Sequence, residues 1–538
     1  MSAEAVAVAP SHARGAEGRA QEAAAAARRD SARRDVTEHG MRRLLVVVGV
    51  MLAALMQTLD STITNVALPT IQGNLGASQD EATWVVTAYS IAAIIVIPLT
   101  PWLQGRFGRK RYFVTSIVGF TLASVACGAS DNLTFLIFSR AVQGAFGGGL
   151  LATAQSILRD TFPPKQLGLS QGIFALGAVM GPALGPPLGG LLVDNWSWNW
   201  CFDINIGPGI ISAILMIWLL RDPESPRASQ IDVVGLVLLA IGLGTMQYVL
   251  TEGEPNYWFA DPVIDFMTLA CVASLVSFIF WELFGTNTPV VDLRVLKNRS
   301  VSAGSVLSFA LGAVLLGSTY TLPQLTQGVL GFTPTESGQL FIVRAVPILL
   351  FTFLIVRLAT KIDTRILVGA GFITLAAANL MQGFVTTAQA SFWSFGLALA
   401  LSGLGLAVLF IPLTIAVLAG VEPAQSPKAS AFLNLSLQLG GSVAVAALDV
   451  FIDQRETFHG SVLGADAVRS NPAVAQFLAS GGKVAQLAGI VHVQSTILSY
   501  ADATFLVAIV AAVCTPLVLL LRKPKGRAPA PTHIEMGG

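Results

Sequence analysis

Apolar runs long enough to cross a bilayer recur along most of the chain, separated by short polar segments. At the rise of an α-helix, about 20 residues span the hydrocarbon core. The pattern predicts an all-α polytopic membrane protein with a long outer loop at 452–499. The fourteen predicted transmembrane helices cover residues 44–68, 84–103, 112–130, 133–158, 169–193, 201–220, 232–251, 262–284, 301–322, 336–357, 365–384, 391–413, 429–451 and 500–521.

The first run carries polar side chains in its outer half, at Gln57, Asp60, Ser61 and Thr64. Their spacings of three and four residues predict that they share one helical face. A carboxylate in hydrocarbon costs several kcal/mol unless it is protonated, paired or hydrated. We therefore interpret Asp60 as a functional residue; the alternative is a structural acid that holds two helices together.

Composition supports a membrane protein, since 54% of the 538 residues are hydrophobic and 12% are charged. That charge content is about half of what a soluble protein carries. The four cysteines are far apart and lack metal-ligand spacing, and His459 and His492 lack it too. We expect no metal, no cofactor and no nucleic-acid partner, and the sequence shows no cluster of catalytic side chains.

Basic residues give the expected orientation. All but five of the 32 Lys and Arg residues lie in segments that fourteen spans place in the cytoplasm. Both termini are therefore expected there, as tails 1–43 and 522–538. The exceptions are Arg140 and Arg344 inside spans, and Arg455, Arg469 and Lys483 in the predicted outer loop.

The two arginines inside spans require partners. Asp60 is sixteen residues from the inner start of its span, or about 24 Å into a core of about 30 Å, while Arg140 is about 10 Å below the outer boundary. These depths agree, so we predict an ion pair between Asp60 and Arg140. For Arg344, about 12 Å below the outer boundary, structural pairing and a substrate contact both remain open.

Three further stretches carry distinctive residues. GRFGRKRYF forms a glycine-containing basic turn, FSRAVQGAFGGGL places Gln143 on the polar stripe of Arg140, and GAVMGPALGPPLGG repeats glycine every four residues. Such a glycine ladder serves either static packing or a surface on which helices shift. The residues concerned are Gly105, Arg106, Gly108, Arg109 and Lys110 in the turn, and Gly177, Gly181, Pro182, Gly185 and Gly189 in the ladder.

Together with LDSTITNVALP and WSWNWCFDINIGPG, these stretches resemble the major facilitator superfamily, in particular its fourteen-span drug/proton antiporter branch. The resemblance covers about residues 44–521. It implies that Asp60 couples to protons, that Arg140 is its neighbour and that the glycine and proline motif belongs to an exporter. One departure is at Pro101 and Gly105, which stand where the family pattern has its opening Gly and an acid, so the sequence lacks the acid of the family's cytoplasmic latch.

The resemblance also implies two six-helix bundles, at residues 44–220 and 301–521, with two inserted spans at the periphery within 221–300. The segment ATKIDTRIL, at residues 359–367, is a weak copy of the basic turn and supports this internal repeat. Near the membrane surfaces, Asp449 and Glu282 are expected at the two interfaces.

The leading functional hypothesis is proton-driven export of hydrophobic small molecules from an inner membrane by alternating access, with Gln57, Thr64, Gln143 and Arg344 as candidate cavity residues. An exporter of one endogenous metabolite or siderophore is the alternative; a membrane-embedded enzyme and a passive channel are more remote. The resemblance further implies that the outer loop docks a periplasmic adaptor leading to an outer-membrane channel, in a host with two membranes.

Overall fold

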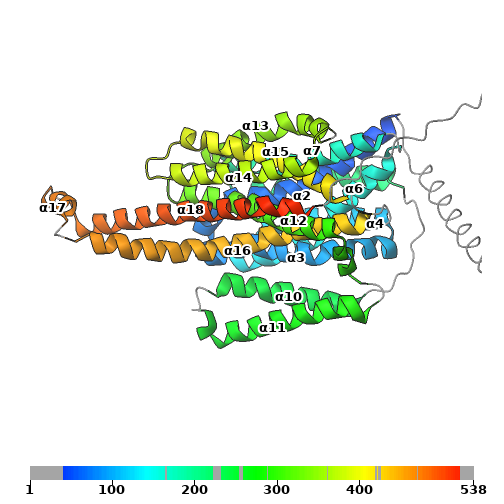
Figure 1. Ribbon diagram of the computed structural model, residues 1–538. Coiled ribbons are helices and arrows are strands. Elements are labelled where there is room, and N and C mark those ends of the chain that lie inside the picture. Colours follow the sequence, from blue (N-terminus) through cyan, green and yellow to red (C-terminus); the bar gives the residue numbers. More distant parts are fainter. Residues whose placement is uncertain are drawn as a thin grey trace, which may run out of the picture.

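The computed structural model describes residues 40–163, 166–221, 232–253, 258–286, 289–359, 361–418, 421, 426–468, 471–480 and 482–521. The predicted tails, apart from residues 40–43, lie outside the described residues. In the described part the regular structure is helical, and the helices run roughly parallel to one another (Figure 1).

The α-helices are α2 (Gly40–Leu75), α3 (Gln79–Phe107), α4 (Arg109–Gly128), α5 (Leu133–Gly147), α6 (Leu150–Thr161), α7 (Leu167–Asn195), α8 (Trp200–Asp203), α9 (Ile206–Leu219), α10 (Val233–Glu252), α11 (Pro262–Phe280), α12 (Arg299–Gly328), α13 (Pro334–Leu358), α14 (Thr364–Val385), α15 (Gly396–Leu418), α16 (Ser426–Asp466), α17 (Pro472–Ala479) and α18 (Val484–Leu517). Short helices of other types are η2 (Trp258–Ala260), η3 (Trp281–Gly285), η4 (Leu293–Lys297), η5 (Phe392–Phe395) and η6 (Val518–Leu520).

Every predicted span coincides with a helix or a pair of consecutive helices. By length and hydropathy, twelve helical segments of the described chain could cross a membrane. The other two predicted spans are α7 and α13, with 29 and 25 residues. The prediction of fourteen helices is therefore confirmed. The fourth span is broken between α5 and α6 at Gly148, where an added Cβ atom would meet the α3 backbone at Ala93.

The helices form two bundles, α2–α9 and α12–α18. Each bundle has its own apolar core, for example around Phe113 and Phe120 in the first and around Phe372 and Phe395 in the second. The bundles meet where α7 packs on α13, α3 on α16 and α2 on α12. These three contacts are the seams that any relative movement of the bundles has to change.

The inserted spans α10 and α11 lie beside the bundles (Figure 1), at the periphery as expected. Helix α10 covers the seam between α3 and α16 and contacts both helices. Trp84 of α3 donates a hydrogen bond to Glu252 of α10 (2.9 Å), and Ser442 of α16 donates one to Gln247 of α10 (3.0 Å). The inserted hairpin is thus bonded to both bundles.

The predicted outer loop at 452–499 is largely helical, which corrects the sequence interpretation. Helix α16 continues to Asp466, α17 forms the tip and α18 begins at Val484, so the segment projects from the bundles as a helical hairpin (Figure 1). Asp502 binds both Arg455 (2.6 Å) and His459 (2.8 Å) at the base of this projection. Hydropathy marks where the apolar span ends, but polar residues can continue the same helix beyond it.

The two acids expected near the membrane surfaces are buried by neighbouring segments of the protein. Glu282 has no exposed surface and accepts hydrogen bonds from the backbone N–H groups of Val290 and Val291 (3.1 and 3.4 Å). Asp449 of α16 is 6% exposed and accepts hydrogen bonds from residues of α3 and α12. Depth along a span therefore did not reveal that neighbouring helices cover these carboxylates.

Candidate functional site

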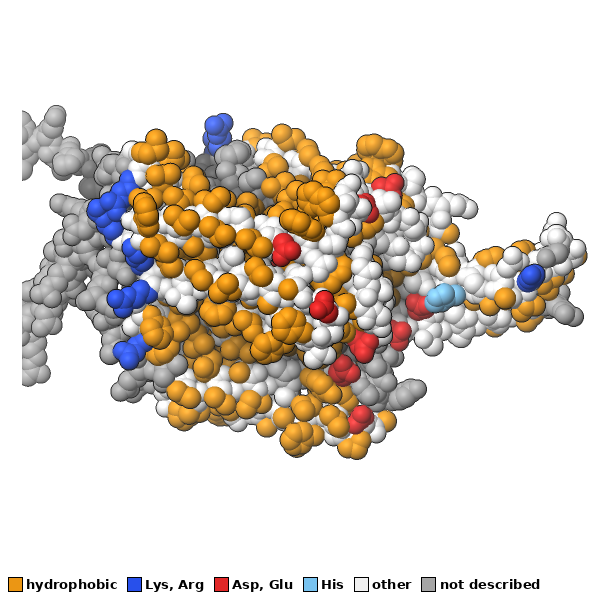
Figure 2. Space-filling model, turned by 180° about the vertical axis from the view of Figure 1, so that it is seen from behind, with side chains coloured by type: hydrophobic (Ala, Val, Ile, Leu, Met, Phe, Trp, Pro, Cys, Tyr) orange, Lys and Arg blue, Asp and Glu red, His pale blue; other side chains and the backbone are white. Residues whose placement is uncertain are grey.

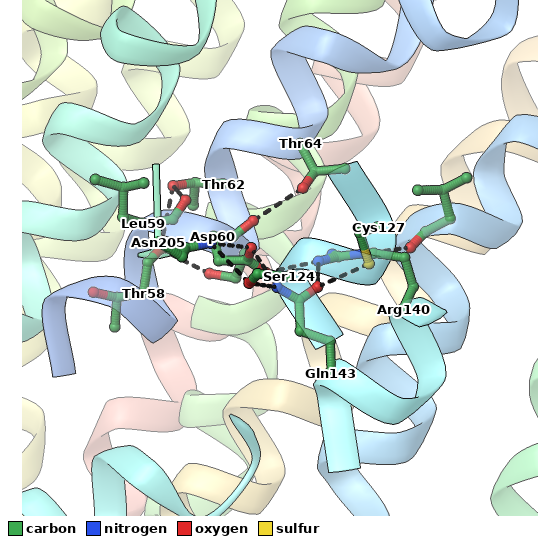
Figure 3. Close-up of polar contacts among 12 residues, drawn as sticks. Thr58, Leu59, Asp60, Thr62, Thr64, Ser124, Cys127, Arg140, Gln143 and Asn205 are labelled. Atoms are coloured by element: carbon green, nitrogen blue, oxygen red, sulfur yellow. Dashed lines mark hydrogen bonds and ion pairs between the residues drawn. The ribbon is translucent and has the colours of Figure 1, made fainter. Parts of the chain in front are cut away.

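The predicted ion pair between Asp60 and Arg140 is present at the centre of the first bundle (Figure 3). Nη1 of Arg140 lies 2.6 Å from Oδ2 of Asp60, and the two side chains are 1% and 0% exposed. Gln143, one helical turn after Arg140, donates to Oδ1 of Asp60 (2.8 Å). The depth argument thus located both partners correctly, and Gln143 belongs to the same cluster.

Two members of this cluster were missed in the sequence. Asn205, between α8 and α9, donates to Oδ1 of Asp60 (2.8 Å). Ser124 of α4 accepts a hydrogen bond from Gln143 (2.6 Å) and lies 3.3 Å from the amide nitrogen of Asn205. Both residues lie about 6–9 Å from the outer ends of their predicted spans, close to the depth of Arg140, but a neutral side chain at that depth does not by itself indicate a site.

Arg140 is held by more than its ion pair. Its Nε donates to the backbone carbonyl of Val85 in α3 (3.0 Å), and its guanidinium lies 4.3 Å from the ring centre of Tyr89. A second bond from Nη1 reaches the Oε1 atom of Gln143 (2.6 Å). A buried charge needs such compensation, because removing one partner of a buried pair typically costs about 3–5 kcal/mol.

A cavity of about 130 Å³ lies between the bundles, next to this cluster. Its wall comes from α2, α3, α5, α6, α12, α15 and α16, and Arg140 is the only charged residue in it among those that the structure describes. Amide and hydroxyl groups supply its other polar surface, from Gln57, Ser61, Asn65, Asn434, Gln438 and Ser442 among others. Drug-sized ligands occupy sites of about 300–1,000 Å³, so the cavity has to widen to admit one.

The predicted polar face of α2 divides between the cavity and the bundle core. Gln57 and Ser61 line the cavity, whereas Asp60 is not part of the wall and lies behind Arg140 in the charged cluster. Thr64 is fully buried and donates to the backbone carbonyl of Asp60 (3.0 Å). A face defined by spacings of three and four is wide enough for one edge to line a cavity while the other packs inward.

Three of the four candidate cavity residues do not line this cavity. Thr64 and Gln143 belong to the charged cluster, and Arg344 lies apart from both sites. Arg344 is 5% exposed, and its Nη1 lies 3.2 and 3.5 Å from the hydroxyl groups of Ser318 and Thr319 on α12. The expectation that Arg344 faces the central cavity is wrong for this conformation. Its recorded side-chain contacts are with two hydroxyl groups, and among the described residues its Nη2 has no hydrogen-bond partner.

The basic turn joins α3 to α4 as the motif predicts. Gly108 has a φ of 87°, a conformation that favours glycine, and it ends α3 and precedes α4. Arg109 forms an ion pair with Asp160 of α6 (2.5 Å). Asp160 therefore supplies an acidic partner for the basic turn within the same bundle, whereas Gly105 has no acidic side chain. Arg106 is exposed at the end of α3.

The glycine ladder of α7 packs directly on α2. A Cβ atom on Gly177 would meet Met51, one on Gly181 or Gly185 would meet Thr58 or Thr62, and one on Gly189 would lie 2.8 Å from Ile63. Thr62 also reaches the carbonyl of Gly181 (3.3 Å). The ladder therefore brings α7 against the helix that carries Asp60; Pro182 lies within it.

Comparisons with known proteins agree with this architecture. The sequence matches the Major Facilitator Superfamily profile over residues 50–445. It is 35% identical to the multidrug export protein EmrB of Escherichia coli K12 over 435 residues, which cover 80% of this chain and 85% of the relative. The fatty acid resistance protein FarB of Neisseria gonorrhoeae is also 35% identical, over 77% of this chain and 82% of its own length.

Among solved structures, a bacterial homologue of the human lysosomal transporter Spinster, in an inward-facing and occupied conformation, is similar with a TM-score of 0.59. The alignment covers 92% of this chain and all of that chain at 16% identity, which supports the fold. With a matched profile over most of its length and relatives above 30% identity, the chain belongs to the major facilitator superfamily, in the branch that contains the EmrB proteins.

Proposed function

We propose that this protein is a proton-coupled exporter of hydrophobic small molecules that works by alternating access. The observation that carries the proposal is the position of Arg140. Its guanidinium binds Asp60 in the bundle core, and the same residue forms part of the cavity wall. One side chain thus connects the candidate proton carrier with the candidate substrate site.

This connection provides a physical basis for antiport. When Asp60 is ionised, Arg140 is attracted to it; when Asp60 takes up a proton, that attraction is lost and Arg140 can interact with an occupant of the cavity. Gln143 and Asn205 can bond to either form of the carboxyl group. Proton binding and substrate binding would therefore change the same contacts.

The distribution of charge supports the proposed orientation in the membrane. On the face in Figure 2, Lys and Arg gather at the end opposite the projection, with a basic side chain also near the tip, whereas Asp and Glu lie from the middle of the body toward the projection. Under the positive-inside rule the basic end faces the cytoplasm. The projection would then lie outside a bacterial inner membrane.

Asp60→Asn tests the proposal. The amide keeps the size of the side chain but carries no titratable proton, so we expect loss of uphill export in proteoliposomes with an imposed pH gradient. Asp265→Asn is the control, because Asp265 is an exposed acid in the first turn of α11. Uphill export that survives in a folded Asp60→Asn protein would refute coupling through this residue.

We further propose that the projection, α17 with the outer parts of α16 and α18, docks an adaptor protein. Exposed apolar side chains occur along it, at Phe458, Val462, Val468, Val484 and Ile490. Apolar groups in a segment beyond the membrane are a feature of protein-binding surfaces. In a host with two membranes, such an adaptor would continue the export path toward an outer-membrane channel.

A further inference from the structure

A second buried carboxylate, Asp449, lies between the two bundles. Its Oδ1 accepts hydrogen bonds from Gln79 of α3 (2.9 Å) and Tyr320 of α12 (3.0 Å). Its Oδ2 lies 3.2 Å from the hydroxyl oxygen of Thr83, which is 2.9 Å from that of Tyr320. Asp449 and Tyr320 belong to the second bundle, whereas Gln79 and Thr83 belong to the first.

This cluster closes one end of the central cavity. On three helices the residues of the cavity wall nearest to this end are Val86, Leu316 and Val445. About one helical turn further along each of these helices come Thr83, Tyr320 and Asp449, respectively. Val86, Tyr320 and Val445 also belong to one apolar cluster, so a continuous plug of packed side chains separates the cavity from this face.

We propose that Asp449, Tyr320, Thr83 and Gln79 form a hydrogen-bonded latch that holds the outer side of the transporter closed. This inference rests on the alternating access of the proposed function. Because the bonds from Gln79 and Thr83 to Asp449 cross the α3–α16 seam, opening of the outer side has to break them. The latch thus sets part of the free-energy difference between the outward-closed and outward-open conformations.

The surroundings of Asp449 explain how it can join two bundles without an ion pair. The donors that the described residues provide are uncharged: one amide from Gln79 and the hydroxyls of Thr83 and Tyr320. The other titratable groups nearby are Asp453, one turn further along α16, and Tyr500 of α18. A carboxylate with several neutral donors can be satisfied when the seam is closed and by water when it opens.

The opposite seam, between α7 and α13, has a different closing contact. Asp194 at the end of α7 accepts a hydrogen bond from the backbone N–H of Thr335 in the first turn of α13 (2.8 Å). Asp194 is exposed, so water can replace this bond at little cost. The buried cluster around Asp449 is therefore the contact whose loss should change the equilibrium most.

Cysteine accessibility tests the latch without substrate or a proton gradient. A Ser90→Cys reporter lies in the cavity wall one turn beyond Val86, behind the plug, and a membrane-impermeant maleimide is added from the side on which α17 lies. The same chain without the reporter measures labelling of the four native cysteines. Loss of about one net hydrogen bond across the seam should raise the labelling rate roughly fivefold. We expect this rise with Tyr320→Phe, which keeps the ring but loses the contact of its hydroxyl with Thr83 across the seam. We also expect it with Asp449→Asn, which replaces charge-assisted hydrogen bonds with weaker neutral ones.

Asp453→Asn is the matched control, because it changes an exposed acid one turn away on the same helix and should leave labelling unchanged. If Asp449→Asn fails to fold, Gln79→Ala tests the same bond from a half-buried residue. Parental labelling rates in folded Tyr320→Phe and Gln79→Ala proteins would overturn the latch. Because labelling needs no transport, this result is separate from the outcome of Asp60→Asn.

Discussion

Asp60 shows how a carboxylate is accommodated inside a membrane-spanning bundle. It is fully buried, and Arg140, Gln143 and Asn205 each donate a hydrogen bond to it. Charge compensation comes from one cation at Oδ2, while both amides donate to Oδ1. An ion with such a shell is tolerated in a low-dielectric interior, but it remains sensitive to the loss of any one partner.

A double-mutant cycle measures the coupling between Asp60 and Arg140. We expect Asp60→Asn and Arg140→Gln each to lower stability, by about 3–5 kcal/mol at most, since each leaves an unpaired buried charge. The double variant should lose less than the sum, because no charge then remains. Thermal unfolding of the detergent-solubilised protein provides the comparison, and additive losses would contradict the coupling.

For individual residues, the sequence predicted the site correctly where burial of a side chain costs much free energy. The cost of a lone charge in hydrocarbon singled out Asp60 and Arg140, and helical rise gave them a common depth. Asn205 and Ser124 are cheaper to bury and so carried no comparable signal. Arg344 was one candidate for the cavity, with structural pairing left open, because depth alone does not say which side of a helix a residue faces.

At the scale of elements, close packing of α7 on α2 places a strict limit on side-chain size. A Cβ atom on Gly181 would lie 2.6 Å from a backbone atom of Thr58, a distance that requires one helix to move. We expect Gly181→Ala to destabilise the protein by about 1–3 kcal/mol and to reduce export. Gly369→Ala in α14, where an added Cβ meets open space, should be tolerated.

Thermal stability and proteoliposome export of these two variants test that limit. Equal stability of Gly181→Ala and the parent would contradict the packing limit. If export nevertheless fell, the result would favour the shifting surface over static packing.

The sequence predicted the number of helices better than the positions of their ends. The apolar runs located fourteen helices because each has to cover the hydrocarbon thickness. The polar continuation of α16 and α18 into the projection has no such requirement, and its two helices are supported by contacts with each other, such as that between Glu456 and His492 (3.1 Å). Hydropathy therefore predicts spans, whereas helix ends also depend on contacts between neighbouring segments.

The tip of the projection offers a test of adaptor docking. Replacement of residues 467–483 by a short Gly-Ser turn removes α17 but keeps the pairs that Asp502 makes at the base. We expect export in vesicles to be unchanged, because the cavity and the charged cluster are distant in sequence and fold from the tip. Resistance of cells with two membranes should fall, and unchanged resistance would leave the tip without this role.

For the whole molecule, the structure is closed at the projection end and has its cavity on the other side of the plug. The cavity residues on α3 extend from Val86 to Ile97, toward the basic end, while Thr83 and Asp449 close the opposite end. Its volume of about 130 Å³ is too small for a drug-sized molecule. Transport thus requires the bundles to move apart, and the inserted helix α10 has to accommodate that movement because it is bonded to both.

The charge of the cavity wall leads to a prediction about substrates. Arg140 is the only charged residue that the described part of the chain contributes to the wall, and Asp60 lies behind it. A lipophilic dication would meet no acid in the cavity, and an unpaired charge in a low-dielectric site costs several kcal/mol, which corresponds to orders of magnitude in affinity. We therefore expect neutral and weakly acidic hydrophobic compounds to be exported better than dications.

Matched series of hydrophobic anions, neutral compounds, monocations and dications, compared in one proteoliposome assay, provide the measurement. Arg344→Gln is the informative variant, because this buried arginine lies outside the cavity wall and should affect stability without changing the order of substrates. Preferential export of dications by the native protein would contradict the prediction. A changed order of substrates in Arg344→Gln would show that Arg344 contacts the substrate in another conformation, in which α13 places it at the widened cavity.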